Sequence, residues 1–165
     1  VRMTGTYVLI LRALSEQSIR IGKLGVFSFP KGFYAYVGSA FGPGGLVARL
    51  RHHLQSTSSP HWHIDYLRRR ADIDEVWVTT KPAKLEHEWA KGFCEMRGVT
   101  VAVSGFGASD CGCHAHLFKF ENRPSFEHFR DQVWQGGTTP ALKRIKPGQE
   151  TLAADISGVN PCAPL

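Results

Sequence analysis

The stretch Y-V-G-S-A-F-G-P-G-G-L-V-A-R-L-R-H-H at residues 36–53 limits the possible folds more than any other part of the chain. It overlaps an alternating run at 33–40, which is typical of a β-strand. Glycine and proline then stop the strand. Leu46, Leu50 and Leu54 follow at intervals of four residues, which places them on one face of a helix. A strand that passes through a tight turn into an amphipathic helix predicts an α/β fold.

The remaining periodicities extend this pattern along the chain. Apolar and β-branched residues predict strands at 5–11, 75–80 and 117–120, a strand pair within 18–29, and a short strand or extended loop at 99–103. Helical spacing predicts helices at 46–55, 63–70, 83–96 and 124–134. We expect one α/β domain at 1–135, with a small mixed, mainly antiparallel central sheet flanked by helices, and an irregular C-terminal tail at 136–165.

The charge of the chain favours an anionic partner. Its 165 residues carry 20 Lys and Arg against 14 Asp and Glu, a formal net charge of +6. Such an excess is typical of proteins that bind polyanions, although a solvated basic surface without a specific partner has the same composition. The first 15 residues lack the features of a secretory leader, and no apolar run reaches the roughly 20 residues of a membrane span. We therefore expect a cytoplasmic protein with no membrane partner.

The glycine-rich turn does not fit the common nucleotide-binding loops. A P-loop requires Gly-x4-Gly-Lys-Ser/Thr, and neither Lys-Ser nor Lys-Thr follows the G-P-G-G turn. A dinucleotide-binding turn requires Gly-x-Gly-x-x-Gly, and the G-P-G-G sequence breaks that spacing. Binding of a nucleotide at this turn is therefore disfavoured.

Four polar side chains around this turn instead suggest phosphate chemistry. Arg49 and His53 are four residues apart on the expected helix and share one of its faces. Tyr36 lies on the preceding strand, and Tyr7 lies on a strand that is expected to pair beside it. A guanidinium binds phosphate with two hydrogen bonds, and an imidazole holds or relays a proton. Each residue alone is commonly structural, so the inference depends on their combination.

In combination, these residues resemble the signature of the GIY-YIG nuclease superfamily. That signature has Gly-Ile-Tyr on one strand, Tyr-Ile-Gly on a paired strand, an Arg and a His four residues apart, and a Glu on a later helix. The corresponding elements here are G-T-Y ending at Tyr7, Y-V-G beginning at Tyr36, Arg49 and His53. The later motif L-E-H-E-W-A-K puts Glu86 in the metal-ligand position, with Glu88 as the competing choice.

The resemblance is to a compact, poorly characterised branch of that superfamily. Its strings G-T-Y, Y-V-G-S-A-F-G-P-G-G, H-W-H-I-D-Y-L and S-D-C-x-C-x-x-H-L-F all occur here, over about residues 5–120. The interval between Tyr7 and Tyr36 is longer than is usual in the superfamily, so an extra hairpin must fit there. The superfamily usually has an Asn near its closing loop. No Asn occupies the matching position here, and Asp110 is the candidate to take over part of the role of that Asn. Some members of the branch are fused to an endonuclease III-type repair enzyme, which implies action on damaged DNA.

The resemblance implies hydrolysis of a phosphodiester bond with one Mg²⁺ or Mn²⁺ held by Glu86. Arg49 would hold the scissile phosphate. Tyr7 or Tyr36 would take the proton from the attacking water, as a phenolate that Arg49 and the metal favour. His53 would orient a tyrosine or relay the proton.

Residues near the strand end and the second helix are candidates for substrate binding. Gly38 would let the backbone approach the substrate, with Ser39 beside it. In H-W-H-I-D-Y-L we expect three polar side chains to face one cleft, where Trp62 or Phe106 would stack on an exposed base. The substrate-binding candidates are Gly38, Ser39, His61, His63, Asp65 and Asp110.

The segment C-G-C-H-A-H contains a possible zinc half-site. Cys111, Cys113 and His116 are candidate ligands, since Zn²⁺ takes four nitrogen or sulfur ligands in a tetrahedron. His61, His63 and His114 are further candidates. The alternative is that the cysteines are buried as small apolar side chains, while the histidines line a DNA groove or cap loops.

The sequence thus predicts one principal function and two alternatives. The principal function is a divalent-metal-dependent DNA endonuclease in DNA repair, acting at a damaged base (uracil or another deaminated base) or at an abasic site, with DNA and other repair proteins as partners. The alternatives are a nucleic-acid-binding module without cleavage activity and a zinc-bearing interaction module. Basic clusters at 68–70 and at Lys143, Arg144 and Lys146 would contact phosphates or form a solvated surface.

Overall fold

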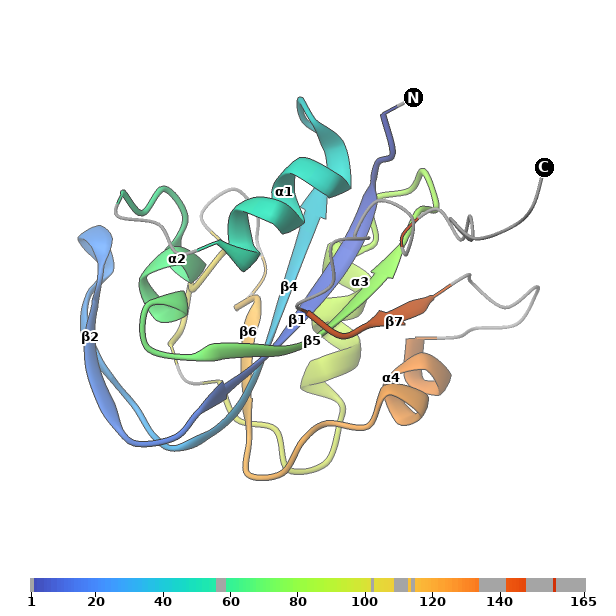
Figure 1. Ribbon diagram of the computed structural model, residues 1–165. Coiled ribbons are helices and arrows are strands. Elements are labelled where there is room, and N and C mark those ends of the chain that lie inside the picture. The colour runs from blue at the N-terminus through green and yellow to red at the C-terminus, as the bar shows by residue number, and fades with distance from the viewer. Residues whose placement is uncertain are drawn as a thin grey trace.

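An antiparallel sheet forms the centre of the protein in a computed structural model, which describes residues 2–55, 59–101, 103–108, 113, 115–133, 142–147 and 156 (Figure 1). The elements in chain order are β1 (Gly5–Ala13), β2 (Gln17–Ile21), η1 (Gly22–Leu24), β3 (Gly25–Phe29), β4 (Gly32–Ala40), α1 (Gly45–Leu54), α2 (His63–Arg68), β5 (Asp72–Thr79), α3 (Glu86–Cys94), β6 (Leu117–Phe120), α4 (Phe126–Val133) and β7 (Lys143–Ile145). The main sheet has the order β6-β4-β1-β5-β7, with neighbouring strands antiparallel. The predicted α/β class with a mainly antiparallel sheet is confirmed.

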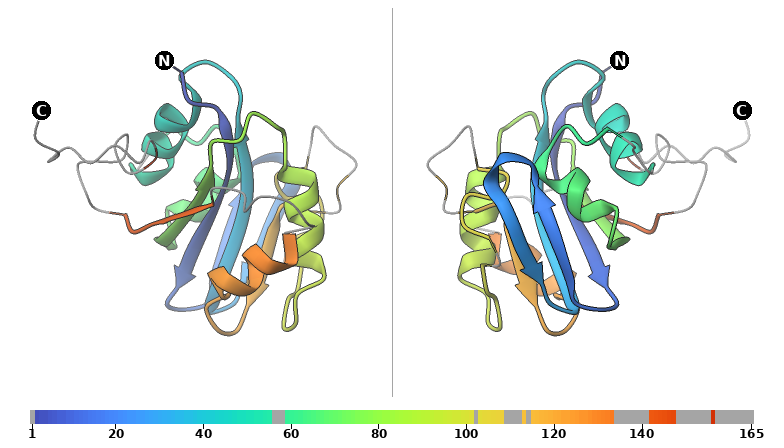
Figure 2. Two further views of the ribbon diagram at one scale, coloured as in Figure 1. Left: turned by 90° about the vertical axis from the view of Figure 1, so that its right-hand side faces the viewer. Right: turned by 90° about the vertical axis from the view of Figure 1, so that its left-hand side faces the viewer.

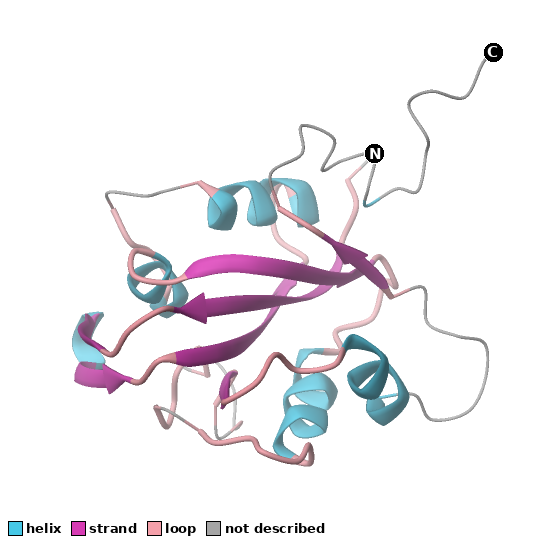
Figure 3. Ribbon diagram, turned by 60° about the horizontal axis from the view of Figure 1, so that its bottom comes forward, coloured by secondary structure: helices cyan, strands magenta, loops and turns pink. Residues whose placement is uncertain are grey.

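Helices cover both faces of this sheet, as Figures 2 and 3 show. On β1, Leu9 and Leu11 point into the core that α1 and α2 share, whereas Val8 and Ile10 point into the core beneath α3 and α4. Burial on both faces explains why β1 reads as a nearly continuous apolar run. None of the helices in the described part of the chain is long and apolar enough to cross a membrane.

The register between β1 and β4 positions the two tyrosines of the predicted site. Tyr7 lies opposite Gly38, and Leu9 lies opposite Tyr36. Because side chains alternate between the two faces of a strand, Tyr7 and Tyr36 point to the same face as diagonal neighbours. Both tyrosines belong to the core that faces α1 and α2.

The first turn of α3 lies at the end of the sheet where β1 begins and β4 ends. Along β4, β6 pairs with residues 33–36. One further hydrogen bond joins Val37 N–H to the His116 carbonyl at 2.9 Å. At the start of β1, the Thr6 hydroxyl accepts a hydrogen bond from Leu85 N–H at 3.2 Å, which fixes the residue that precedes α3. Side chains from α3 can therefore reach the edge of β4 beyond the end of β6.

The long interval between Tyr7 and Tyr36 holds the extra hairpin that the motif spacing requires. β2 and β3 pair with each other and form a separate two-stranded sheet. Ile19, Ile21 and Phe29 pack into the same core as Tyr7 and Tyr36. The hairpin therefore extends an existing core.

The segment 136–165, expected to be irregular, contributes a strand to the sheet. β7 pairs antiparallel with residues 76–78 of β5, and both Ile145 and Ile156 are buried. A strand of three residues is too short to show a period of two, so local pattern does not reveal it. Its formation depends on the exposed edge of β5.

A buried carboxylate links β7 to the sheet. Glu75 of β5 is 1% exposed and accepts hydrogen bonds from Trp77 Nε1 at 3.0 Å and from Arg144 Nε at 2.8 Å. Arg123 Nη1 lies 3.2 Å from the same carboxylate. Burial acts to raise the pKa of Glu75, but the hydrogen bonds from Arg144 and Trp77 and the nearby positive charges outweigh it and lower that pKa. Arg144 is therefore ion-paired with Glu75, so its charge is partly compensated within the protein.

We expect Glu75→Gln to lower the free energy of unfolding at neutral pH by about 1–3 kcal/mol, since the guanidinium groups lose their carboxylate partner. Because folding lowers the Glu75 pKa, this stabilisation is present above the unfolded-state pKa and is lost as the pH falls through the lowered folded-state pKa. Urea unfolding of both proteins should show a difference that shrinks in acid. Exposed Glu88→Gln is the control. An equal effect of the two substitutions would contradict this account.

Candidate functional site

Two glycines set the entry into α1 and thereby its orientation. Gly44 and Gly45 have φ values of +80° and +63°, in the left-handed region that other residues rarely adopt. Leu46 N–H then donates to the Met3 carbonyl at 2.8 Å. Leu46 and Leu50 enter the core, so the neighbouring helix face that carries Arg49 and His53 lies beside the tyrosines.

Tyr7 lies across Gly38 and makes a buried hydrogen bond to His53. Its hydroxyl oxygen is 2.7 Å from His53 Nε2. A Cβ atom added to Gly38 would lie 2.5 Å from both Cζ and the hydroxyl oxygen of Tyr7, far inside van der Waals contact. The space above Gly38 therefore holds the Tyr7 ring, and the expected role of Gly38 in admitting substrate is replaced by one in positioning Tyr7.

Asp65 lies behind His53 and is 1% exposed. Its Oδ2 accepts hydrogen bonds from the backbone N–H of His61 at 2.8 Å and of Trp62 at 3.0 Å, and His52 Nε2 is 3.2 Å away. Burial acts to raise the pKa of Asp65, but the adjacent His53, the two N–H groups and His52 outweigh it and hold that pKa well below its usual range. Asp65 is an ionised positioning residue, and the expectation that it contacts substrate needs this correction.

His53 is a neutral imidazole between Asp65 and Tyr7. Burial lowers its pKa below the ordinary value of 6.5, although Asp65 acts in the opposite direction. His53 Nδ1 is buried, has no hydrogen-bond partner among the described residues, and lies 3.7 Å from Asp65 Oδ1. We assign the imidazole proton to Nδ1, because the carboxylate faces that atom. Nε2 then accepts the hydrogen bond from the Tyr7 hydroxyl.

Both tyrosines of the site hold their protons tightly. Burial raises the pKa of Tyr7 well above its ordinary value of 10.0, and burial also raises the pKa of Tyr36. Arg49 acts in the opposite direction on both groups, and its effect is smaller than that of burial. These surroundings therefore do not stabilise the phenolate that Arg49 was expected to favour. Tyr36 is 8% exposed and Tyr7 only 1%, so Tyr36 is the more accessible of the two.

Arg49 presents an uncompensated positive charge beside the tyrosines. Its guanidinium carbon lies 4.0 Å from the centroid of the Trp62 ring, a cation–π contact that holds the side chain in place. Within the described ranges Arg49 forms no salt bridge, and it is half-buried. Trp62 was expected to stack on a base, and here it supports Arg49. The arrangement suits the binding of an anion such as phosphate.

Glu86 is the candidate metal-binding carboxylate of the site. It is half-buried at the start of α3, and its charge acts on Tyr7, Tyr36 and His116. No side-chain hydrogen bond or salt bridge joins it to another described residue. One unpaired, partly exposed carboxylate fits Mg²⁺ or Mn²⁺, which take oxygen ligands and keep several waters. Glu88 is exposed and lines a different depression with Lys91, so the geometry favours Glu86.

Several of the other candidates for substrate binding have structural contacts of their own. His63 Nδ1 accepts a hydrogen bond from Gly107 N–H at 3.0 Å, so His63 holds a loop. Phe106 is fully buried at 0% exposure, and the expectation that it stacks on a base is wrong. By strand alternation Ser39 is on the opposite face of β4 from Tyr36. His61 is exposed and contacts the edge of Trp62. Asp110 is outside the described residues.

The expected phosphate contact of Arg68 is also corrected by its hydrogen bonds. Its Nε and Nη1 donate to the carbonyls of His53 and Ala71, each at 2.8 Å, and its Nη2 donates to the Leu54 carbonyl at 3.4 Å. Two of these carbonyls end α1, where the helix has no N–H donors of its own left for them. Arg68 therefore joins α2 to the end of the helix that carries His53.

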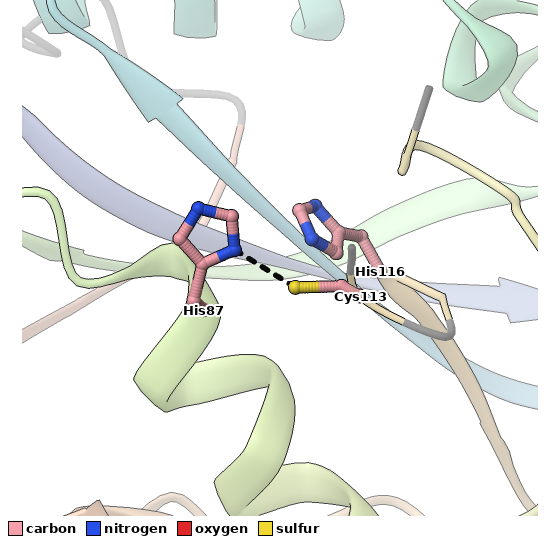
Figure 4. A group of neighbouring side chains, drawn as sticks. All are labelled: His87, Cys113 and His116. Atoms are coloured by element: carbon pink, nitrogen blue, oxygen red, sulfur yellow. Dashed lines mark hydrogen bonds between the residues drawn. The ribbon is translucent and has the colours of Figure 1, made fainter. Parts of the chain in front are cut away.

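The expected zinc ligands are only partly within the described residues. Cys113 and His116 lie close to His87 of α3, which sequence reasoning did not select (Figure 4). Cys111 and His114 are outside the described residues. The feature of the sequence that could have pointed to His87 is its position directly after Glu86 in L-E-H-E-W-A-K.

Comparison with known proteins identifies the family. Residues 6–137, which are most of the chain, match the family described as Domain of unknown function DUF123, and the chain belongs to it. No curated protein and no solved structure matches the chain significantly.

We expect Gly38→Ala to displace the Tyr7 ring and lower the free energy of unfolding by about 1–3 kcal/mol, as overpacking of a core does. Gly42→Ala is a matched control, because a Cβ atom there would meet nothing within 4 Å. Urea unfolding of both variants measures the effect. Equal stability of the two variants would show that Tyr7 does not need the space above Gly38.

Proposed function

We propose that this member of the DUF123 family is a divalent-metal-dependent DNA endonuclease with an active site of the GIY-YIG type. One observation carries the proposal. Tyr7, Tyr36, Arg49, His53 and Glu86 come from β1, β4, α1 and α3, and they converge at one end of the sheet. Tyr7 and Tyr36 both lie against His53, and the charges of Arg49 and Glu86 act on both tyrosines. Unrelated structural residues would have no reason to meet in this combination.

The buried hydrogen bond between Tyr7 and His53 supplies a route for the proton of the attacking water. Tyr7 gives its hydroxyl proton to His53 Nε2 while its oxygen accepts the proton from water. The resulting imidazolium lies between Tyr7 and the ionised Asp65, which stabilises its charge. No free phenolate accumulates, which agrees with the raised pKa of Tyr7.

Arg49 and Tyr36 bind the phosphate in this proposal. The Arg49 guanidinium offers paired N–H donors to two phosphate oxygens, and Trp62 limits its motion. Tyr36 is the more exposed of the two tyrosines, and its hydroxyl donates to a third phosphate oxygen. A divalent cation held by Glu86 would neutralise charge that builds up on the phosphate and the leaving oxygen. Chain residues alone would leave that charge only partly compensated.

The substrate class follows from charge and from the motif resemblance. The formal net charge of +6 suits a polyanion, and the branch that the strings resemble includes fusions to DNA repair enzymes. We therefore propose that the substrate is DNA that contains a damaged base, such as uracil or another deaminated base, or an abasic site. Other repair proteins are the proposed partners.

We expect Glu86→Gln to reduce cleavage by roughly 100-fold or more, the scale of losing one charged group that acts on the transition state. The assay is cleavage of labelled single strands, duplexes, flaps, and duplexes with uracil, hypoxanthine or an abasic site, in Mg²⁺ or Mn²⁺. Glu88→Gln is the matched control on the same helix turn and should keep wild-type activity. Binding without cleavage by the wild-type protein would replace the nuclease with a binding module. Full activity of Glu86→Gln would refute the site.

The pH dependence of cleavage tests the proton route. The route needs neutral His53, so the rate falls as pH drops through the His53 pKa, which burial holds below 6.5. Asp65→Asn removes a charge that raises this pKa, so the acid limb should move to lower pH while the plateau rate falls. Single-turnover rates against pH measure both. An acid limb that Asp65→Asn leaves in place would contradict the role of His53.

A further inference from the structure

A group of nitrogen and sulfur side chains lies beside the proposed nuclease site. His87 is on the exposed side of the first turn of α3, and Cys113 and His116 lie on the segment that leads into β6. One ligand atom from each residue lies within 4.8 Å of the others, and His87 Nδ1 is 2.8 Å from Cys113 Sγ. Figure 4 shows the three side chains pointing toward one another from two separate elements.

We propose that His87, Cys113 and His116 bind a zinc ion. Two imidazoles and a thiol suit Zn²⁺ and do not suit Mg²⁺, which prefers oxygen. With bonds of about 2.0–2.3 Å and tetrahedral angles, zinc ligand atoms lie roughly 3.3–3.7 Å apart. The observed separations, from 2.8 Å for His87 Nδ1 and Cys113 Sγ up to a limit of 4.8 Å, span that range. Binding releases the thiol proton to solvent and replaces the His87–Cys113 contact with two metal–ligand bonds.

The backbone already holds two of these ligands in place. His116 N–H donates to the Phe106 carbonyl at 2.8 Å, and the His116 carbonyl accepts from Val37 N–H at 2.9 Å. His116 is therefore fixed to the edge of β4, with its side chain 2% exposed. His87 is fixed by α3. A metal ion would join α3 to the β4–β6 edge, and the exposure of His87 leaves the fourth zinc position to water or another ligand.

The second histidine group of the molecule does not offer the same chemistry. His52, His53 and Asp65 also lie within 4.8 Å of one another. However, Asp65 accepts hydrogen bonds from two backbone N–H groups, and His53 Nε2 is bonded to Tyr7. Metal binding there would compete with the buried hydrogen bonds that Asp65 already accepts. The zinc proposal therefore concerns only the His87 group, and it goes beyond the nuclease proposal because it does not depend on cleavage.

The test measures metal directly. The tag-free full chain is analysed for zinc by mass spectrometry, and the apoprotein is titrated with Co²⁺ while its absorption is recorded. We expect one zinc per chain and a thiolate-to-cobalt charge-transfer band. His87→Ala and Cys113→Ser should each weaken zinc binding at least tenfold, since even a group that supports a ligand contributes about 10–100-fold.

Cys94→Ser is the matched control, because Cys94 is an exposed cysteine at the other end of α3. It should keep the zinc and the cobalt band. Circular dichroism of each variant separates loss of the site from loss of the fold. Absence of zinc and of the cobalt band in the folded wild-type protein would overturn the proposal, as would unchanged affinity in folded His87→Ala. Neither outcome bears on cleavage.

Discussion

The close approach of Tyr7 to Gly38 is the contact on which the rest of the candidate site depends. The β1–β4 register places these residues opposite each other, and the missing side chain of Gly38 lets the Tyr7 ring lie over β4. From that position the hydroxyl reaches His53 on α1. A slip of one residue would send Tyr7 to the other face, into the core beneath α3 and α4. The pairing of β1 with β4 therefore also fixes the geometry of the site.

The polar groups of the site fall into two sets by burial. Asp65, His53 and Tyr7 are each 1% exposed, and backbone N–H groups compensate the charge of Asp65. The groups that can meet a ligand, Arg49 and Glu86, lie outside them and are half-buried. A buried ionised group needs fixed partners to offset the loss of hydration, whereas the outer groups keep their charges for a ligand. This division separates residues that position from residues that bind.

The first turn of α3 carries two different donor groups side by side. Successive helix residues point in directions about 100° apart, so the two side chains have different neighbours. The charge of Glu86 acts on the tyrosines, and His87 contacts Cys113. The carboxylate suits a hard cation, and the imidazole with a thiol suits zinc. A metal ion bound by His87 would hold the helix end that presents Glu86. The two proposed sites would then be structurally linked while differing in metal.

Local pattern in the sequence determined the strands other than β7, the helices, and the placement of Tyr36 directly before the helix that carries Arg49 and His53. These depend on residues within a few turns of one another, where periodicity and turn chemistry dominate. The tertiary structure alone decided that Asp65 lies behind His53, that β7 completes the sheet, and that His87 meets Cys113. Those contacts join segments far apart in the chain, and side-chain packing across strands and helices brings them together. The periodicity of residues that are near one another in the sequence does not reveal that packing.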